Sequence, residues 1–290
     1  MSATDFSNLK IPPGVLVCPD CRVVLTGDAD VLTCVRCNAS FSSESNVLKL
    51  YPPSRAQEIE HGLESFRSPH SNVRSTPFFR ALIPPNPICD ATKSTREARV
   101  CGLMASGLVL NLGSKDSRWG EHVVNVDIVA PLKGGVDVLA DIAALPFADA
   151  SVDGVICTYV LEHVADARAC IAEIARVVRP GGTVYVAIPF MFPTHPDPLD
   201  RWRWTLDGLR HSMGAFDEIE AGCSGGPWSA YVAIVPTLTA SLFSNFVLFN
   251  AIRFALGWAM WPLKFLDYVA SGSKYEHMTA ANFYFLGRKK

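Results

Sequence analysis

The chain has 290 residues, of which 49% are hydrophobic and 19% are charged, and its formal net charge is −2. This length accommodates one large domain or two smaller ones, and the apolar content excludes a disordered chain. The near balance of charge argues against bulk electrostatic binding of nucleic acid, for which a strongly basic protein is typical.

Four of the nine cysteines are clustered, at Cys18, Cys21, Cys34 and Cys37. They form two Cys-x2-Cys pairs, a pattern that binds Zn²⁺ through four thiolates at tetrahedral geometry. Four protein ligands leave no open coordination position, so we expect a structural site. The alternatives are unrelated buried cysteines or two disulfides. The uneven cysteine spacing and the polar residues 1–10 lead us to expect a cytoplasmic protein.

Composition divides the chain into three regions. Residues 1–52 are expected to form a zinc ribbon, residues 53–100 a linker with one or two short helices, and residues 101–290 the main domain. Short apolar runs in the main domain alternate with helical patterns, which predicts an α/β fold with a mostly parallel, Rossmann-like sheet and helices on both faces. The expected strands are residues 108–112, 122–126, 136–139, 152–157, 183–188, about 216–222 and 282–287, and the expected helices are residues 166–178 and 206–213.

Residues suited to nucleotide binding follow the first three of these strands. Gly113 ends the first, and a glycine turn there lets the backbone approach a ligand closely. Asp127 ends the second strand, where a carboxylate can accept hydrogen bonds from ribose hydroxyls. Asp141 follows the third, where it can hold an adenine amino group. The alternative is that both carboxylates only cap strand ends.

The order of these segments resembles a class I S-adenosylmethionine-dependent methyltransferase of type 11. The segments Val160-Leu161-Glu162-His163-Val164 and Arg179-Pro180-Gly181-Gly182 support this resemblance, and residues 1–52 are similar to a Trm112-like zinc ribbon. The resemblance implies a seven-stranded methyltransferase sheet, S-adenosyl-L-methionine as cofactor and a structural Zn²⁺. The cofactor-binding residues that it implies are Asn111, Gly113, Ser114, Lys115, Asp127, Asp141, Ile142 and Thr158.

The first motif departs from the family pattern, which usually reads acidic-x-Gly-x-Gly-x-Gly. Only Gly113 remains of the glycines, Asn111 carries no carboxylate, and Lys115 stands in place of a glycine. A lysine tolerates such a turn if its φ is negative or if the strain is compensated. Its ammonium can instead pair with the carboxylate of the cofactor. Weakened cofactor binding, or a non-catalytic scaffold, is the alternative.

Residues 189–205 form a loop rich in proline, aromatic and charged residues, which we expect beside the cofactor edge of the sheet. Methyl transfer needs alignment and often a base. We expect His195 to be the base and Asp197 to orient it, with His163 as the second candidate. The expected substrate-binding residues are Arg201, Trp202, Arg203 and Trp204, which suit an anionic group and a ring. The alternative is that these arginines and aspartates pair with one another and that Thr205 caps a helix.

A long apolar stretch precedes the last expected strand. Residues 221–252 contain no Asp, Glu, Lys, Arg or His, and we expect a helical apolar insertion at about residues 228–270. Its length permits a membrane span, but a single span would separate the last strand from its own sheet. The alternatives are a buried lid, a homodimer face and peripheral membrane contact through residues 228–263.

These patterns predict a methyltransferase that acts on a small-molecule, glycan or lipid-linked acceptor, at oxygen, in the cytoplasm or at a membrane. A methyltransferase of rRNA or tRNA is the first alternative, although residues 18–37 hold as basic residues only Arg22 and Arg36, against three aspartates. A nucleic-acid partner is therefore not expected. The second alternative is a methyltransferase-like scaffold that has lost its cofactor.

Overall fold

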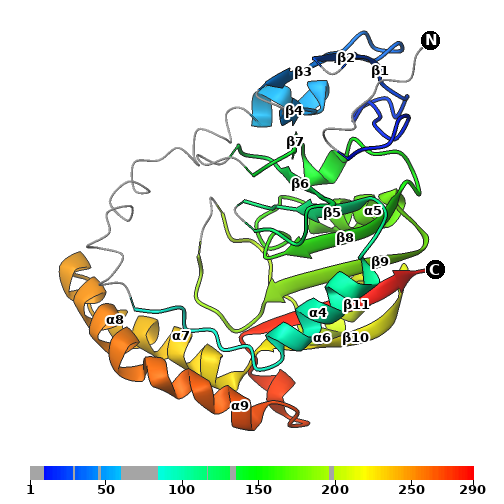
Figure 1. Cartoon of the computed structure of the whole chain (residues 1–290). Coiled ribbons are helices and arrows are strands. Elements are labelled where there is room, and N and C mark those ends of the chain that lie inside the picture. The colour runs from blue at the N-terminus through cyan, green and yellow to red at the C-terminus, as the bar shows by residue number, and fades with distance from the viewer. Residues whose placement is uncertain are drawn as a thin grey trace.

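The computed structural model describes residues 10–28, 30–44, 47–59, 84–115, 117–130, 135–195 and 199–290. Its main feature is one large sheet in which the strands follow the order β1-β2-β3-β4-β7-β6-β5-β8-β9-β11-β10 (Figure 1). The strands of the main domain are β5 (Val109–Leu112), β6 (Val123–Asp127), β7 (Val138–Leu139), β8 (Val152–Thr158), β9 (Val178–Pro189), β10 (Phe216–Gly225) and β11 (Asn282–Lys289).

These seven strands form the sheet that the sequence predicts. Strands β7, β6, β5, β8 and β9 are parallel neighbours, and β11 is inserted antiparallel between β9 and β10. Every residue of β5 and β6 is buried. Burial on both faces explains why these strands are nearly continuous apolar runs rather than alternating ones.

The N-terminal region extends this sheet instead of standing apart from it. Its strands β1 (Thr26–Gly27), β2 (Val31–Thr33), β3 (Ser40–Glu44) and β4 (Val47–Lys49) are antiparallel neighbours. Strand β4 then pairs in parallel with β7, with Leu48 opposite Val138. Side chains of both regions, including Leu48 and Val138, belong to one hydrophobic core. Packing against the main domain therefore helps to stabilise the ribbon.

Helices cover both faces of the sheet. Helices α5 (Ala167–Val177) and α6 (Leu206–Ser212) pack on one face, and α4 (Lys93–Leu103) packs on the other. The expected boundary at residue 101 falls inside α4. Pro53–Arg55 forms the short 3-10 helix η2, within the expected linker.

The expected alternation of strands and helices is wrong at two connections. No helix occurs between β5 and β6, or between β6 and β7, among the residues that the structure describes there. Each connection has about ten residues, fewer than a helical crossover usually needs. Trp119, from the first connection, packs against Tyr185 of β9 with ring centroids 5.7 Å apart and covers part of the face that a helix would cover.

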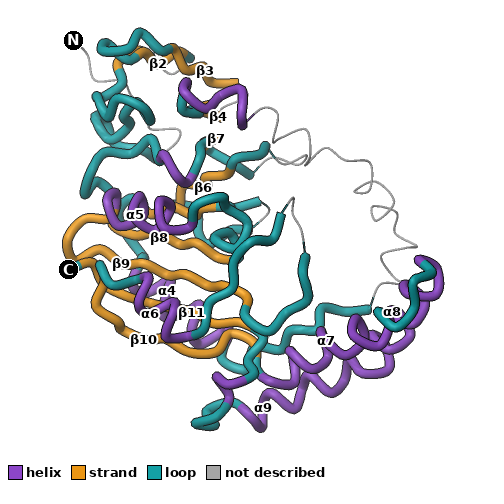
Figure 2. Tube along the Cα trace, turned by 180° about the vertical axis from the view of Figure 1, so that it is seen from behind, coloured by secondary structure: helices purple, strands orange, loops and turns teal. Residues whose placement is uncertain are grey.

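The apolar insertion is helical, as expected. It consists of α7 (Pro227–Ala240), α8 (Phe246–Met260), the 3-10 helix η4 (Trp261–Leu266) and α9 (Asp267–Ala270), followed by the short η5 (Glu276–Met278). Figure 2 shows α7 and α8 side by side, at the end of the molecule opposite the ribbon. Helix α7 buries six of its residues, whereas α8 buries none. Of the alternatives left open for the insertion, a buried lid therefore does not describe α8.

Candidate active site

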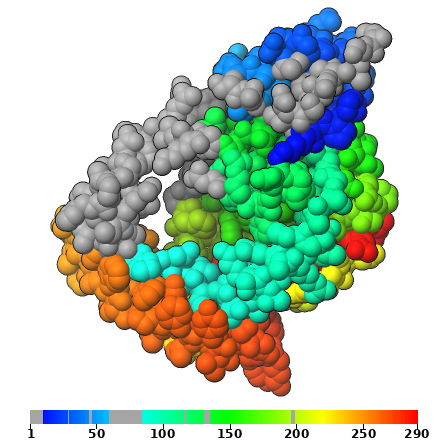
Figure 3. Space-filling model, in the orientation of Figure 1, coloured from blue at the N-terminus to red at the C-terminus, as the bar shows by residue number. Residues whose placement is uncertain are grey.

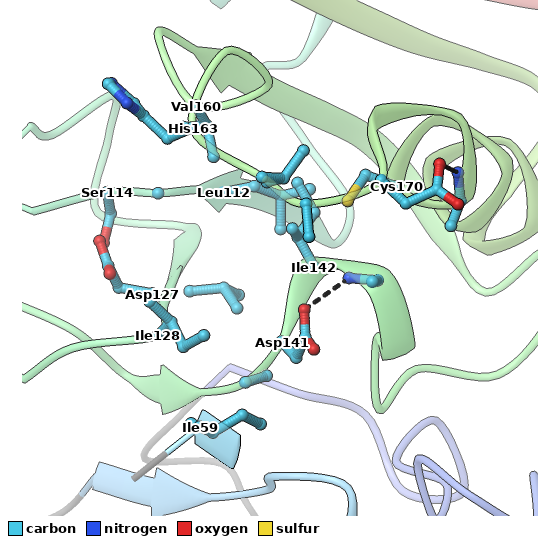
Figure 4. Close-up of a pocket in the computed structure, with 18 of the residues that line it drawn as sticks. Ile59, Leu112, Ser114, Asp127, Ile128, Asp141, Ile142, Val160, His163 and Cys170 are labelled. Carbon is cyan, nitrogen blue, oxygen red and sulfur yellow. Dashed lines mark hydrogen bonds between the residues drawn. The ribbon is translucent and has the colours of Figure 1, made fainter. Parts of the chain in front are cut away.

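A cavity of about 820 Å³ lies at the carboxyl ends of β5, β6, β7 and β8 (Figure 4). This volume is typical of a small-molecule site, and the ends of parallel strands are where α/β sheets bind ligands. The sequence-predicted residues that line it are Gly113, Ser114, Lys115, Asp127, Asp141, Ile142, Thr158, His163 and Arg201. The cavity thus gathers most of the residues that the resemblance implies.

The turn after β5 has the backbone shape that a glycine favours. Gly113 has φ +66°, and a Cβ at this position would lie 2.1 Å from Cγ2 of Val160. Lys115 also has a positive φ, of 41°, which is strained for a residue with a side chain. Its backbone N–H donates a 2.9 Å hydrogen bond to Oδ2 of Asp127. This hydrogen bond stabilises the turn and so offsets backbone strain at Lys115.

Asp127 is buried and firmly held at the end of β6. Its Oδ1 accepts a 3.0 Å hydrogen bond from the backbone N–H of Val129, while Oδ2 accepts the bond from Lys115. An ionised carboxylate has about four acceptor sites, so further donors can still bind. The aspartate is therefore suited to accept hydrogen bonds from ligand hydroxyls in the cavity.

Ser114 provides the observation that points to a polar ligand. The side chain is 1% exposed, it lines the cavity, and its Oγ has no hydrogen-bond partner within the described part of the chain. A buried hydroxyl without a partner is costly. A polar ligand in the cavity would remove that cost.

Asp141 is engaged on both of its oxygens. Oδ1 accepts a 2.9 Å hydrogen bond from the N–H of Ala143 and so caps the 3-10 helix η3 (Ile142–Ala144). Oδ2 accepts a 2.5 Å bond from the guanidinium of Arg55, which also lines the cavity. Arg55 was not predicted as a site residue, because nothing in the linker sequence indicates that it reaches this strand end.

Asn111 does not line the cavity. Its amide nitrogen donates to the backbone oxygen and Oγ of Ser117 and to Oδ1 of Asn125, at 3.1 to 3.2 Å. These bonds hold the loop after β5 against β6. The structure therefore places Asn111 behind the cavity and not in its lining, so its predicted contact with a cofactor stays a prediction.

Glu162 forms a cluster with the two candidate bases. Its side chain is fully buried, and its Oε1 lies 3.8 Å from Nε2 of His163 and 3.8 Å from Nε2 of His195. The nearby carboxylate raises the pKa of His195 above its ordinary value. His163 lines the cavity, whereas His195 is not part of the lining. Glu162 lies in the segment from Val160 to Val164 that supports the family resemblance. Nothing in the sequence indicates that its carboxylate lies beside the imidazole of His195.

The predicted substrate-binding residues have mixed surroundings. Arg203 forms an ion pair with Asp200 and lowers the pKa of that carboxyl to about 2. This pair agrees with the alternative that the arginines and aspartates of the loop pair with one another. Arg201 lines the cavity and donates to the backbone oxygen of His163 at 2.8 Å. Trp202 is 40% exposed, and its ring centroid lies 6.4 Å from that of Trp204. Neither tryptophan lines the cavity, and Asp197 lies outside the described residues.

Thr205 caps α6, as predicted for the alternative interpretation of the loop. Its side-chain oxygen accepts a 3.1 Å hydrogen bond from the backbone N–H of Gly208. This cap fixes where the loop of residues 189–205 ends and helix α6 begins.

The four clustered cysteines come together in the ribbon. Their sulfur atoms lie within 4.8 Å of one another, and Sγ of Cys18 is 3.7 Å from Sγ of Cys37. A tetrahedral site with Zn–S bonds of about 2.3 Å requires sulfur–sulfur distances of about 3.8 Å. All four thiols are free, which excludes the disulfide alternative here. The donor set and its spacing fit a structural Zn²⁺.

Residues 103–186 match the family model described as a methyltransferase domain. The chain carries a methyltransferase domain. Among curated relatives, the chain is 41% identical over 61 residues to an O-methyltransferase of Aspergillus nomiae, covering 21% of this chain and 27% of the relative. It is 46% identical over 59 residues to demethylmenaquinone methyltransferase of Corynebacterium efficiens, covering 20% and 25%. The matches thus span about a quarter of the length of these relatives.

Solved structures resemble the chain over a longer range. One of them is 1,6-didemethyltoxoflavin-N1-methyltransferase of Burkholderia thailandensis, whose structure holds 1,6-didemethyltoxoflavin and S-adenosylhomocysteine. It is 12% identical, with a TM-score of 0.44, and the match covers 90% of this chain and all of that one. The sheet order confirms the fold predicted from the sequence, and the match at residues 103–186 agrees with the predicted resemblance over that part of the chain.

Proposed function

We propose that the protein is an S-adenosylmethionine-dependent methyltransferase whose cofactor binds in the cavity above β5, β6 and β7. The observation that carries this proposal is the placement of Asp127 and Asp141 at adjacent strand ends on one cavity, next to the glycine turn. A nucleoside needs two such polar contacts, one at the ribose and one at the base. The domain match at residues 103–186 includes all of these positions.

The chain's own residues would divide the cofactor among them. Asp127 would accept hydrogen bonds from the ribose hydroxyls, and Asp141 with the adjoining η3 would hold the adenine edge. The turn at Gly113 would lie against the methionine part, and its buried Ser114 hydroxyl would gain the partner that it lacks. The cofactor supplies an electrophilic methyl group when bound.

The acceptor would enter beside His163 and Arg201, which line the cavity. We propose a small-molecule, glycan or lipid-linked acceptor that is methylated at oxygen. The imidazole cluster at Glu162 would receive the acceptor proton, and Arg201 would attract an anionic group. The names of the Aspergillus and Corynebacterium relatives support methyl transfer to a small molecule, including at oxygen.

We further propose that the helical insertion attaches the protein to a membrane surface. One helical stretch, Phe246–Ala270, is long and apolar enough to cross a membrane by length and composition alone. Strands β10 and β11, on either side of the insertion, are direct neighbours in one sheet, so the chain must return to the side from which it left. Helix α8 alone is about 22 Å long, shorter than the ~30 Å hydrocarbon core. An interfacial position fits both facts.

Calorimetric titration of the full chain with S-adenosylmethionine tests the cofactor assignment. We expect saturable binding that Asp127→Ala weakens by about 10- to 100-fold, because hydrogen bonds to a charged group contribute ~1.5–3 kcal/mol. Asp217→Ala, at an exposed aspartate of β10, serves as the matched control and should bind normally. A folded protein that binds no cofactor at millimolar concentration would favour the scaffold alternative.

A further inference from the structure

The least satisfied polar group in the described structure is the carboxylate of Glu162. The residue is fully buried, and neither Oε1 nor Oε2 has a hydrogen-bond partner among the described residues. Burying an ionised carboxylate without a partner costs several kcal/mol, so such groups are normally paired or bound to a metal. The position therefore favours a cation.

The nearby side-chain cations are committed elsewhere. The guanidinium of Arg201 donates to the backbone oxygen of His163, and the guanidinium of Arg203 pairs with Asp200. What faces Glu162 instead is a pair of imidazoles, each with its Nε2 at 3.8 Å from Oε1. This separation is too long for a hydrogen bond.

Both imidazoles are oriented by acceptors on their other nitrogen. Nδ1 of His163 lies 2.6 Å from the backbone oxygen of Leu199, and Nδ1 of His195 lies 3.2 Å from that of Pro193. Nδ1 of His195 is also 3.2 Å from the Asp200 carboxylate. Because these oxygens only accept, Nδ1 is the donor in each contact, which leaves Nε2 as the atom of each ring that can bind a metal through its lone pair. This arrangement is the usual support of a metal-binding histidine.

We propose that Glu162, His163 and His195 bind a divalent transition-metal ion, separate from the four-cysteine site of the ribbon. The three donor atoms lie within 4.8 Å of one another. Metal bonds of about 2.1 Å require donor separations of about 3.0–3.4 Å, so the three donors would move closer together when the metal binds. Two imidazoles and one carboxylate suit Zn²⁺, Fe²⁺ or Co²⁺ better than the oxygen-preferring Mg²⁺ or Ca²⁺.

The site has room for a ligand from outside the chain. Three protein donors leave at least one coordination position open, which is typical of catalytic rather than structural metal sites. His163 also lines the cavity, so the metal would lie at its edge. A hydroxyl oxygen bound to the metal would lose its proton to solvent more readily, and in this metal-bound state the two imidazoles would hold the metal instead of receiving the acceptor proton. This last consequence rests on the proposed methyl transfer, whereas metal binding itself does not.

Metal stoichiometry tests the proposal on the full chain. Protein stripped with a chelator and then dialysed against Zn²⁺ should hold two ions per chain by mass spectrometry of the metal. Glu162→Gln keeps the side-chain shape but removes the charge, and it should hold one ion. Glu121→Gln, at an exposed carboxylate, is the control and should hold two. A wild-type chain with one ion, or a Glu162→Gln chain with two, would overturn the proposal.

Substitution by Co²⁺ distinguishes the two sites. Cobalt in the four-cysteine site gives intense near-ultraviolet thiolate bands, and cobalt bound by imidazole and carboxylate gives only weak visible bands. Glu162→Gln and His163→Gln should each abolish the second component and leave the thiolate bands intact, which also shows that the ribbon is still folded. If both variants keep the weak visible bands as well as the thiolate bands, the proposal is contradicted. Calorimetry with S-adenosylmethionine is scored separately, so failure of cofactor binding and failure of metal binding are distinguishable.

Discussion

The guanidinium of Arg55 donates a 2.5 Å hydrogen bond to the carboxylate of Asp141, and this pair joins the N-terminal region to the wall of the cavity. Arg55 follows the ribbon strands, whereas Asp141 follows β7 of the main domain. Because β4 and β7 are also paired, the ribbon and the candidate cofactor site are mechanically connected. In Figure 3 the ribbon surface is continuous with that of the main domain.

Arg55→Ala should weaken S-adenosylmethionine binding by about 5- to 30-fold. The substitution removes part of the cavity wall and the bond that fixes Asp141, and a hydrogen bond between charged groups at a partly buried site contributes roughly 1–2 kcal/mol. Calorimetric titration measures the change. Arg179→Ala is the control. It breaks the ion pair of Arg179 with Asp153, whose side chains are 51% and 31% exposed, and it should leave the affinity unchanged. Equal affinities for all three proteins would show that Arg55 has no part in the site.

Removal of zinc should lower both stability and cofactor affinity. The four thiolates close a ribbon that has little core of its own, and part of that core is shared with the sheet around β7. We expect a chelator, or the change Cys34→Ser, to lower the melting temperature and to weaken S-adenosylmethionine binding together. Cys101→Ser, at an exposed thiol outside the cluster, is the control. Unchanged cofactor binding by a zinc-free protein would contradict the connection through β4 and Arg55.

Gly113→Ala should abolish cofactor binding and destabilise the protein. A Cβ at this position would clash with Val160, and the positive φ would add strain of about 1–2 kcal/mol. Gly272→Ala separates the two effects, because Gly272 has φ +81° with no atom within 4 Å of the added Cβ. Urea unfolding should therefore show a larger loss for Gly113→Ala than for Gly272→Ala. If both variants lost the same small amount of stability, the predicted clash between a Cβ at position 113 and Val160 would be contradicted.

Asp267→Ala should destabilise the helical insertion. The buried Asp267 carboxylate accepts backbone N–H bonds from Trp228 and Ser229 and a 2.6 Å bond from the Ser229 hydroxyl, so it caps the start of α7 from a distant part of the chain. Loss of this network should cost about 2–4 kcal/mol. Limited proteolysis should then cleave within residues 227–270 before the main domain. The exposed Asp217→Ala change provides the comparison, and equal protease resistance would refute the capping role.

Membrane attachment is tested by charge substitutions on α8. Phe246 is 81% exposed and Val247 is 75% exposed. Removing such side chains from lipid costs ~1.5–3 kcal/mol each, so Phe246→Glu with Val247→Glu should reduce sedimentation with phosphatidylcholine–phosphatidylglycerol vesicles at least tenfold.

Val35→Glu supplies the matched control for this assay, since Val35 is 63% exposed on the ribbon and lies outside the insertion. It should sediment with vesicles as the wild type does. A wild-type chain that ignores vesicles but forms a dimer, which the α8 substitutions dissociate, would assign the apolar face to a homodimer instead.

Local sequence was sufficient to predict the strands, the clustered cysteines and the two aspartates of the cavity. A buried parallel strand is an apolar run, a zinc knuckle is a Cys-x2-Cys turn, and Asp127 and Asp141 directly follow their strands. Because the carboxyl ends of parallel strands meet at one edge, local position was enough to bring these carboxylates to one cavity.

Contacts between distant segments came from the folded chain alone. Three contacts join segments that are far apart along the chain: the pairing of β4 with β7, the bond from Arg55 to Asp141, and the placement of the His195 imidazole beside the buried Glu162. The exposure of α8 is of the same kind, because an apolar helix has the same sequence pattern whether it faces a core or solvent. Such features depend on which surfaces the folded chain brings together, and no local periodicity records that choice.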